Sequence, residues 1–492
     1  MSLPYRIIVG LETHVELATA TKMFCRCAND PFGSEPNTNI CPVCLGMPGT
    51  LPVPNREAIR HSILVGKALG STIAEYSKWD RKHYFYPDNP KGYQISQYDM
   101  PLCIGGQVEL LDAKGEMESV VRFERIHLEE DAGKLQHAAD GISHVDLNRA
   151  GVPLIEMVSL PDLTSPEQAR RFLQELRLLV RRLGVSDADM EKGQMRCDVN
   201  INIAFEHGGE TVKTPITEVK NVNSTRAVER SITTEAQRQY DEWMAGGPIT
   251  TRKNKLTAGW DEGTNTVKIQ RAKEAANDYR YFPEPDIPPI AVYKLEDLHP
   301  DTVAANLPEL PNALRRRLLA AGIESAVLES ILAEPEDLEY LLEYVDTRGL
   351  PAKVVGNWLK QIPEAFRHLQ ADQLVATVGL VQAGDVSFSA LKEKWAPFMS
   401  SLGQGMPGEK SASEQVREAA EANGLLQSHD EGVVQSLIEQ VFAANPQAVA
   451  DYKSGNVRIL GFLVGQVMKA AAGKAQPAKV QEAVQNALTK IE

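Results

Sequence analysis

Residues 6–17, RIIVGLETHVEL, indicate the architecture of the N-terminal half of the chain. Five apolar side chains fall on one face at every second position: Ile7, Val9, Leu11, Val15 and Leu17. The opposite face carries Glu12, His14 and Glu16. This alternation predicts a β-strand with one buried face. The residue types alone leave two interpretations of the other face open, since it either meets water or lines a polar site.

The 492 residues around this strand correspond to about three domains of ordinary size. Short strand-like segments, turns and a few helical patterns predict an α+β fold up to the proline-dense segment 281–289, YFPEPDIPP, which cannot continue a helix or a central strand. Beyond it the apolar spacing is helical, and the Gly/Ser-rich segment 400–413 indicates a linker. We therefore expect a mixed β-sheet and helix domain over 1–293, an all-helical domain over 294–405 and a small helical tail domain over 406–492.

One helix of the first domain is marked at both ends. Ser165 and Pro166 supply a capping residue followed by proline at the first helical position, and Gly184 marks the end. Apolar side chains recur between them at three- and four-residue steps: Ala169, Phe172, Leu173, Leu176, Leu179, Val180 and Leu183. This spacing predicts an amphipathic helix over 166–183 whose apolar stripe faces the core.

Composition excludes several classes of protein. Asp and Glu outnumber Lys and Arg by 66 to 52, so the formal charge of −14 requires that any contact with nucleic acid be a local basic patch. The chain has no uninterrupted apolar run long enough to cross a bilayer, so we expect no membrane association. The first residues carry neither a signal peptide pattern nor a transit pattern, so we expect a cytoplasmic protein.

Four of the six cysteines lie in two pairs. Cys25 and Cys27 form a CxC pair, and after thirteen residues Cys41 and Cys44 form a CxxC pair. Four thiolates match a structural Zn²⁺ site, which stiffens a loop and has no open position for catalysis. Two other interpretations stay open: four reduced cysteines without metal, and a redox CxxC, which lacks its usual βαβ surroundings here.

Carboxylates recur inside otherwise apolar, strand-like segments. Glu129 and Glu130 lie in RIHLEEDAGK, Glu156 in GVPLIEMVS, and Asp198 in MRCDVNI. Buried carboxylates require cations, and their hard oxygen atoms suit Mg²⁺, which in turn bridges nucleotide phosphates. A histidine ligand such as His14 is unusual for Mg²⁺ and points to Mn²⁺ or to a water-mediated contact.

Cations and aromatic side chains are interleaved in segment 79–101. They are Arg81, Lys82, Lys91, Tyr84, Phe85, Tyr86, Tyr93 and Tyr98. This mixture is typical of surfaces that hold phosphates and stack bases. Packing within a hairpin around the turn Asp88-Asn89-Pro90 explains the same pattern equally well.

Several catalytic motifs are absent from the sequence. Its Gly-Lys pairs lack the upstream glycine of a P-loop, and no GxGxxG opens a dinucleotide-binding helix. No Gly-x-Ser-x-Gly elbow is present either. We therefore expect that this chain does not hydrolyse an amide itself.

Long segments of the sequence closely resemble the B subunit of the bacterial aspartyl/glutamyl-tRNA amidotransferases. The resemblance covers nearly the whole chain and is weakest between residues 295 and 450. It rests on IVGLETHVEL, DRKHYFYPDNPKGYQISQ, HLEEDAGK, VDLNRAGVPLIEMVS, RCDVNINI, EVKNVNS, DYRYFPEPDIPP and the tail segment NPQAVADYKSGNVRILGFLVGQVMKAAAGKAQP.

The resemblance implies an α+β cradle domain, a helical domain and a mobile tail that contacts the outer corner of tRNA. It implies that ATP phosphorylates the side-chain carboxylate of Glu-tRNA(Gln) or Asp-tRNA(Asn), and that ammonia then attacks to give the amide. Ammonia comes from glutamine hydrolysed by an amidase partner, the A subunit, while a small C subunit makes the assembly a heterotrimer. Five basic residues and no acidic residue between 452 and 480 agree with a tRNA-contacting tail: Lys453, Arg458, Lys469, Lys474 and Lys479.

The resemblance also implies roles for individual residues. Residues of the metal and ATP pocket are Glu12, His14, Glu130, Glu156 and Asp198, with Glu129 and Arg196 close by. Phosphate or acceptor-arm contacts fall to Lys82, Tyr84, Lys91 and Lys220. Zinc-bearing members use cysteines that match Cys25, Cys27, Cys41 and Cys44, whereas other members lack them, so zinc is dispensable to the chemistry. The segment Leu45–Gly49 is the turn expected near the tRNA acceptor end.

The sequence departs from the family pattern at four places. Thr250-Thr251-Arg252 stands where Gln-Glu-Thr-Arg is usual, and Gln270 stands where Met is common. Asn456 replaces a frequent Lys, and Gln476 is also unusual. The change at 456 removes one charge from the expected tRNA contact, whereas no departure falls on the carboxylates.

Two alternatives to a catalytic component of an amidating enzyme stay open. A noncatalytic tRNA-binding scaffold would not need the buried carboxylates. An unrelated, zinc-stabilised ligase for a small molecule would bind no tRNA and would need no basic tail.

Overall fold

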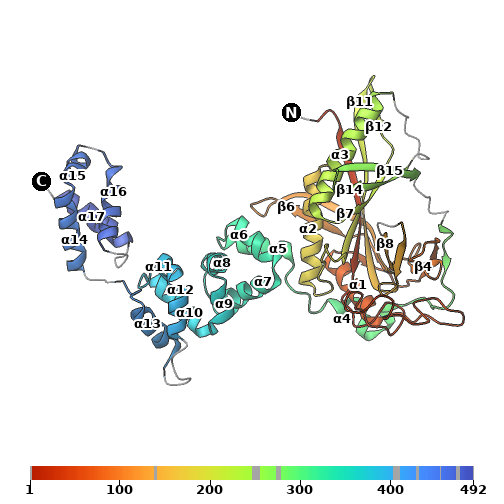
Figure 1. The fold of residues 1–492 in the computed structure, drawn as a ribbon, viewed down its shortest axis with the longest axis horizontal. Helices are drawn as coiled ribbons and strands as arrows, with labels where there is room; N and C mark the ends of the chain where they lie inside the picture. The colour runs from red at the N-terminus through yellow and green to blue at the C-terminus, as the bar shows by residue number, and fades with distance from the viewer. Residues whose placement is uncertain are drawn as a thin grey trace. The chain divides into compact units, whose positions relative to one another are not determined.

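The computed structural model describes residues 3–137, 141–246, 255–272, 279–402, 410–427, 431–454, 456–471 and 477–490. The chain divides into two compact units, Met1–Ala320 and Ala321–Glu492. Strands dominate the first unit and helices the second, so the predicted α+β class is confirmed (Figure 1). The division into three domains at residues 293 and 405 stays a prediction. The departures at 250–252 and at Gln476 lie outside the described residues.

An eleven-stranded sheet forms the centre of the first unit. Its strands are β1 (Arg6–Glu16), β2 (Thr72–Ile73), β5 (Cys103–Ile104), β6 (Gln107–Leu111), β7 (Met117–Glu130), β10 (Pro153–Ser159), β11 (Met195–His207), β12 (Glu210–Lys213), β13 (Thr217–Val222), β14 (Leu256–Asp261) and β15 (Thr266–Ala272). They run in the order β15-β14-β13-β11-β1-β10-β7-β5-β2, with β12 on β11 and β6 on β7. The strand predicted from the alternating pattern, β1, therefore lies in the middle, between β10 and β11.

Two small sheets accompany the large one. β3 (Asp80–His83), β4 (Tyr93–Ser96) and β16 (Phe282–Pro283) form a three-stranded sheet, and β8 (Lys134–His137) pairs with β9 (Ser143–Asp146). The aromatic and basic segment 79–101 thus forms a hairpin, β3 and β4, around the turn at residues 86–92.

Three helices of the first unit pack against strands of the large sheet: α1 (Arg56–Ala68), α2 (Pro166–Arg182) and α3 (Thr225–Met244). Helix α4 (Pro300–Ala304) packs against α1 and helix α5 (Pro311–Ala320) against α2, and short 3₁₀ turns lie at Val292–Lys294 and Glu296–Leu298. The predicted helix is confirmed as α2. The Ser165 hydroxyl accepts a hydrogen bond from the amide of Gln168, and the apolar stripe is buried. Helices α2 and α3 pack side by side along the sheet (Figure 1).

The core of the first unit includes the apolar face of β1. Val9, Leu11 and Val15 have no exposed surface. The same core continues beyond the proline-dense segment to Val292 and Leu298, so these residues belong to the first unit.

The second unit is helical. Its helices are α6 (Ser325–Ala333), α7 (Pro335–Leu342), a π-helical turn (Glu343–Thr347), α8 (Ala352–Gln361), α9 (Glu364–His368), α10 (Ala371–Ala383), α11 (Phe388–Glu393), α12 (Trp395–Leu402), α13 (Ala412–Ala422), α14 (Glu431–Ala444), α15 (Pro446–Lys453), α16 (Ile459–Ala470) and α17 (Pro477–Lys490). Among the described residues, none of the helices has the length and apolar content that a membrane crossing requires.

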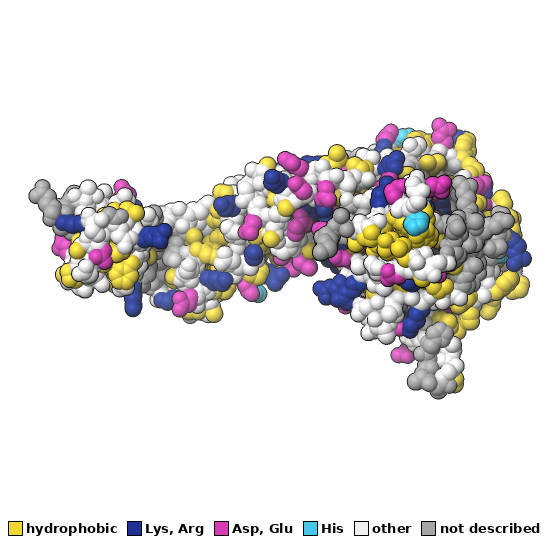
Figure 2. All heavy atoms as spheres, turned by 90° about the horizontal axis from the view of Figure 1, so that it is seen from above, with side chains coloured by type: hydrophobic (Ala, Val, Ile, Leu, Met, Phe, Trp, Pro, Cys, Tyr) yellow, Lys and Arg dark blue, Asp and Glu magenta, His cyan; other side chains and the backbone are white. Residues whose placement is uncertain are grey.

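Charged side chains of both signs share the surface. Lys and Arg are interspersed with Asp and Glu over the face seen in Figure 2. Four of the five basic tail residues lie in the described part of the chain and are exposed, namely Lys453, Arg458, Lys469 and Lys479.

Candidate active site

The strand register places polar residues of four strands in one row. His14 of β1 lies opposite Glu156 of β10, and Glu156 lies opposite His127 of β7. On the other side of β1, Arg196 of β11 lies opposite His14. Residues opposite one another in an antiparallel sheet project from the same face. The row therefore crosses the polar face of the central strands, which is the face that β1 does not bury in the core.

Three residues of this face form what we call the His14 cluster: His14, Glu129 and Glu156. His14 Nε2 lies 3.4 Å from Glu156 Oε2 and 3.9 Å from Glu129 Oε1. His127 Nε2 is also 3.4 Å from Glu156 Oε2. One ligand atom from each member lies within 4.8 Å of the others, so the group can hold a cation. The donor set is one imidazole and two carboxylates, which suits Mn²⁺ or a similar divalent metal.

The charges of the His14 cluster depend on one another. Burial alone would lower the pKa of His14, but the hydrogen bond to Glu156 and the charges of Glu156, Glu129 and Asp198 outweigh it and raise this pKa to about 9. Burial would raise the pKa of Glu156, but the His127 charge and hydrogen bonds from both imidazoles hold it well below its usual range. Without a metal, the protonated imidazole of His14 offsets part of the carboxylate charge. A metal that binds His14 must therefore displace its proton.

A second acidic group, the Glu12 cluster, lies on the same face and consists of Glu12, Asp198 and Glu218. Glu12 lies opposite Asp198, and Glu218 follows on β13. Lys220 Nζ lies 2.9 Å from Asp198 Oδ2 and 3.5 Å from Glu218 Oε1, while the Asn200 amide donates to Glu12 Oε1 at 2.8 Å. Lys220, which the sequence assigned to phosphate or acceptor-arm contacts, therefore supplies the counter-charge of this group.

The hairpin β3–β4 contributes a cation and a phenol. Lys82 Nζ lies 3.9 Å from Glu129 Oε2 and 5.5 Å from the centroid of the Tyr279 ring. The Tyr84 hydroxyl donates to Gln94 Oε1 at 3.3 Å, and burial raises the pKa of this phenol. Of the predicted phosphate contacts, Lys82 thus lies directly beside the His14 cluster.

Arg196 binds another carboxylate of the polar face. Its guanidinium donates to Asp131 Oδ2, and Arg149 Nε lies 3.5 Å from the same oxygen. Arg196 is opposite His14 in the register, and its role in an ATP and metal pocket stays a prediction. Its charge is paired with Asp131.

Glu130 lies apart from both clusters. Its carboxylate accepts hydrogen bonds from the Lys91 ammonium and from the backbone amide of Ile95, the latter at 2.9 Å. Glu129 and Glu130 are consecutive in β7, so their side chains project from opposite faces. The structure therefore brings Glu129 to His14 and Glu156, and it does not bring Glu130 there.

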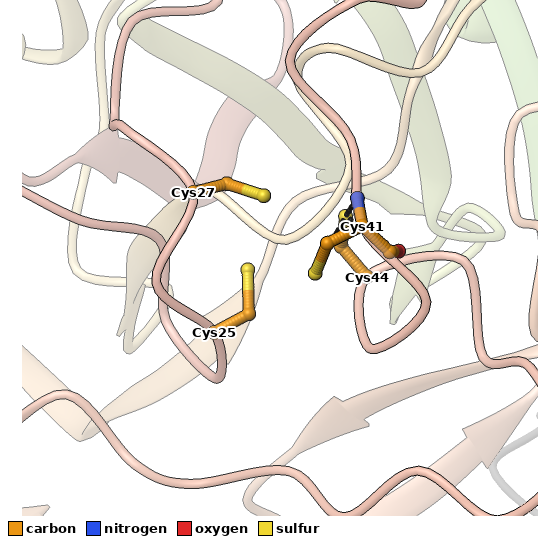
Figure 3. A group of neighbouring side chains, drawn as sticks. All are labelled: Cys25, Cys27, Cys41 and Cys44. Carbon is orange, nitrogen blue, oxygen red and sulfur yellow. Dashed lines mark hydrogen bonds between the residues drawn. The ribbon is translucent and has the colours of Figure 1, made fainter.

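The four paired cysteines converge (Figure 3). Cys25 and Cys27 come from one loop and Cys41 and Cys44 from another, and their sulfurs lie within 4.8 Å of one another. The Cys41 and Cys44 sulfurs are 3.9 Å apart, close to the ~3.8 Å that two sulfurs about 2.3 Å from a tetrahedral zinc ion would have. We call this group the cysteine knuckle, and its donors fit zinc.

One thiol of the cysteine knuckle, that of Cys44, has a lowered pKa, whereas the hydrogen bond with Cys44 raises the pKa of Cys25 and burial raises that of Cys27. The hydrogen bond with Cys25, the backbone amide of Cys41 and the charge of Lys22 lower the pKa of Cys44 to about 5. Lys22 is buried, and its ammonium lies 4.0 Å from the Cys44 sulfur. A low thiol pKa favours the thiolate that metal binding requires.

Sequence reasoning missed two members of the polar face. Both His127 and Glu218 are buried. His127 Nε2 lies 3.4 Å from Glu156 Oε2, and a Glu218 oxygen lies within 4.8 Å of ligand atoms of Glu12 and Asp198. The period of two in RIHLEED would have revealed His127, because it places His127 on the face of Glu129 and leaves Glu130 with Leu128. Glu218 carried no comparable signal, because its strand is short and its register with β11 is interrupted between Cys197 and Val199.

Comparison with known proteins agrees with this architecture. Residues 7–296 match the GatB/GatE catalytic domain, and residues 366–488 match the GatB domain. Three relatives are each named as the B subunit of aspartyl/glutamyl-tRNA(Asn/Gln) amidotransferase. The protein from Moorella thermoacetica is 41% identical over 98% of this chain and 100% of its own length. Those from Thermomicrobium roseum and Thermotoga maritima are 42% and 41% identical, each over 98% of this chain and 99% of its own length.

These matches define a component of an aminoacyl-tRNA amidotransferase. The chain belongs to the GatB/GatE family, as residues 7–296 and the full-length relatives show.

Proposed function

We propose that this chain carries the site at which ATP phosphorylates the side-chain carboxylate of Glu-tRNA(Gln), Asp-tRNA(Asn) or both, and at which ammonia then forms the amide. The observation that carries the proposal is the juxtaposition of the His14 cluster and the Glu12 cluster on one face of the large sheet. A noncatalytic scaffold would not need so many buried carboxylates, because each costs free energy unless a cation balances it.

The chemistry explains why such a face is useful. A carboxylate has no leaving group that ammonia can displace, whereas an acyl phosphate has one. A divalent metal, when bound, stabilises the charge on the phosphate oxygens. We propose that His14, Glu129 and Glu156 hold this metal, with Glu129 in the place that the sequence assigned to Glu130.

Other residues of the polar face have complementary tasks. Glu12 and Asp198 offer further metal ligands once Lys220 turns from them to a phosphate. Lys82 offers a second cation beside Glu129. The ammonium groups of Lys220 and Lys82 neutralise the charge of a polyphosphate, while the carboxylates hold the metal.

Partner proteins complete the proposed enzyme. The sequence has no Gly-x-Ser-x-Gly nucleophile elbow, so we propose that an amidase partner, the A subunit, hydrolyses glutamine and that a small C subunit makes the assembly a heterotrimer in the cytoplasm. Lys453, Arg458, Lys469 and Lys479 are exposed and offer positive charges to the phosphate backbone of tRNA.

Amide formation on tRNA tests the proposal. The chain would be copurified with its amidase partner and the small third protein, then supplied with ATP, Mg²⁺ and separately prepared Glu-tRNA(Gln) and Asp-tRNA(Asn). Glutamine would be the nitrogen source in one series and free ammonia in the other. We expect amide in both series, and its loss in Glu129→Gln but not in Glu124→Gln, an exposed glutamate of the same strand.

Three outcomes separate the alternatives. Amide with ammonia but not with glutamine would place the defect in the partner glutaminase. No amide from either source, with tRNA still bound, would support a noncatalytic scaffold. No binding of tRNA would support a ligase for a small molecule.

A further inference from the structure

The turn that carries Cys41 and Cys44 continues to Gly46, which lies against Lys91 of the hairpin β3–β4. Gly46 follows Cys44 by two residues and has a φ of +63°. A β-carbon at this position would overlap Lys91 Cγ and lie 3.0 Å from Cδ and 3.1 Å from Cβ. The aliphatic stem of Lys91 is therefore packed directly against the backbone of the knuckle, with no room for a side chain at position 46.

The knuckle turn that carries Gly46 is well ordered by its own hydrogen bonds. The amides of Leu45, Gly46 and Met47 donate to the carbonyl oxygens of Cys41, Val43 and Pro42 at 2.9–3.1 Å. The Cys41 amide also donates to the Cys44 sulfur at 3.1 Å. A metal on the four sulfurs would tie this turn to the loop of Cys25 and Cys27, and so would fix the position of Gly46.

Lys91 is held at its other end by Glu130. The Lys91 and Glu130 side chains are only 8% and 4% exposed. The Ile95 amide donates a hydrogen bond to the Glu130 carboxylate. Gly151 lies between Glu130 and Cys44, since a β-carbon at position 151 would be 3.4 Å from Cys44 Cβ and 3.9 Å from Glu130 Oε2. The ion pair therefore lies in a small cavity that Cys25 and Cys44 also line.

We propose that the cysteine knuckle is a clamp that positions the Lys91 ammonium on Glu130 through the contact of Gly46 with the lysine stem. A lysine side chain has four rotatable bonds and loses considerable entropy when it is held in one geometry. The knuckle confines the stem, so the ion pair forms with little further loss. The clamp holds the Lys91–Glu130 ion pair in place. That this ion pair assists amidation rests on the proposed function, whereas the existence of the clamp does not.

The position of Lys91 can be measured without activity. The full-length chain would be treated with a short pulse of acetic anhydride, and acetylation of each lysine would be followed by mass spectrometry. Lys114, an exposed lysine of the turn between β6 and β7, serves as the internal reference. Gly46→Ala would be compared with Gly49→Ala, since Gly49 also has a positive φ but has nothing within 4 Å of its β-carbon position. Wild-type chain with zinc and after chelation forms the second comparison.

The clamp predicts that Gly46→Ala raises the acetylation rate of Lys91 relative to Lys114 about tenfold, because a hydrogen bond between charged groups is released. Gly49→Ala should leave the rate unchanged, and chelation should raise it. An unchanged rate in both Gly46→Ala and the chelated chain would overturn the clamp, as would an equal rise in both glycine variants. If Gly46→Ala does not fold, chelation and Cys44→Ser decide in its place.

Amide formation would be followed in parallel with the complete complex. A chain that makes no amide but shows the predicted acetylation pattern would retain the clamp and contradict the proposed function. A chain that makes amide but shows no change in the acetylation of Lys91 would support the proposed function and contradict the clamp.

Discussion

Glu129 and Glu130 are neighbours in the chain, but their carboxylates serve opposite faces of β7. Glu129 Oε1 lies 3.9 Å from His14 Nε2, whereas Glu130 Oε1 accepts the Ile95 amide at 2.9 Å and pairs with Lys91. The alternation of a β-strand imposes this separation. Substitution of adjacent residues therefore tests two different sites.

Metal affinity should distinguish the two glutamates. Glu129→Gln removes a carboxylate from the His14 cluster, and we expect Mn²⁺ affinity to fall at least about 10- to 100-fold, the range seen when even supporting groups of metal sites are lost. Glu130→Gln should change it far less. Titration calorimetry on the full-length chain measures both, with Glu124→Gln as the control. A larger loss of Mn²⁺ affinity in Glu130→Gln than in Glu129→Gln would show that Glu130 is the metal ligand, as predicted from the sequence.

His14 should make the stability of the metal-free chain depend on pH. Its pKa is raised from 6.5 to about 9 in the folded chain, so the protonated imidazole stabilises the fold fully below pH 6.5, and this contribution is lost as the pH rises through about 9. The contribution is at most about 4 kcal/mol. We expect the melting temperature of the wild type to fall relative to that of His14→Gln across this interval. Parallel melting curves for the two proteins from about pH 6 to about pH 9.5 would be inconsistent with a charged His14.

The cysteine knuckle should hold one zinc ion per chain. Release of zinc by a mercurial reagent, followed by a colorimetric chelator, would measure the stoichiometry. Cys44→Ser removes the thiol with the lowered pKa and should abolish tight binding, because a structural zinc site requires all four ligands. Cys103→Ser, at a buried cysteine outside the knuckle, is the matched control. Equal zinc content in both variants would refute a site at the knuckle.

Packing of α2 on the sheet should be a major source of stability in the first unit. Phe172 has no exposed surface, and its ring centroid lies 5.7 Å from that of Phe123. Phe172→Ala should lower the free energy of unfolding of this unit by about 3–5 kcal/mol because it leaves a cavity. Denaturant unfolding followed by circular dichroism gives the change, and Gln174→Ala on the exposed side of α2 should cost less than about 1 kcal/mol. A small change in the free energy of unfolding for Phe172→Ala would show that neighbouring side chains move to fill the cavity.

Local patterns were sufficient to predict much of the fold. The alternation of β1 and the cap, proline and apolar steps of α2 are short-range signals, and both elements were predicted at close to their observed bounds. The two cysteine pairs were predicted to converge because their spacing defines a loop. Each of these signals lies within one continuous segment.

Long-range relationships were harder to predict. The order of the eleven strands decides that His14 meets Glu156 and that Glu12 meets Asp198, and strand order is not encoded in the period of any single strand. The pairing of Glu130 with Lys91 depends on a separate hairpin. The resemblance to known relatives supplied the candidate residues, and the structure assigned them to faces.

Aminoacyl-tRNA-dependent release of ADP tests the central claim most directly. The copurified complex would receive ATP, Mg²⁺ and Glu-tRNA(Gln) or Asp-tRNA(Asn), with glutamine and ammonia omitted so that only the phosphorylation step is measured. We predict ADP release with at least one charged tRNA but not with the uncharged tRNA, its loss in Glu156→Gln, and its retention in Glu206→Gln, which changes an exposed glutamate of β11. Undiminished ADP release by Glu156→Gln would contradict the assignment of phosphorylation to this polar face.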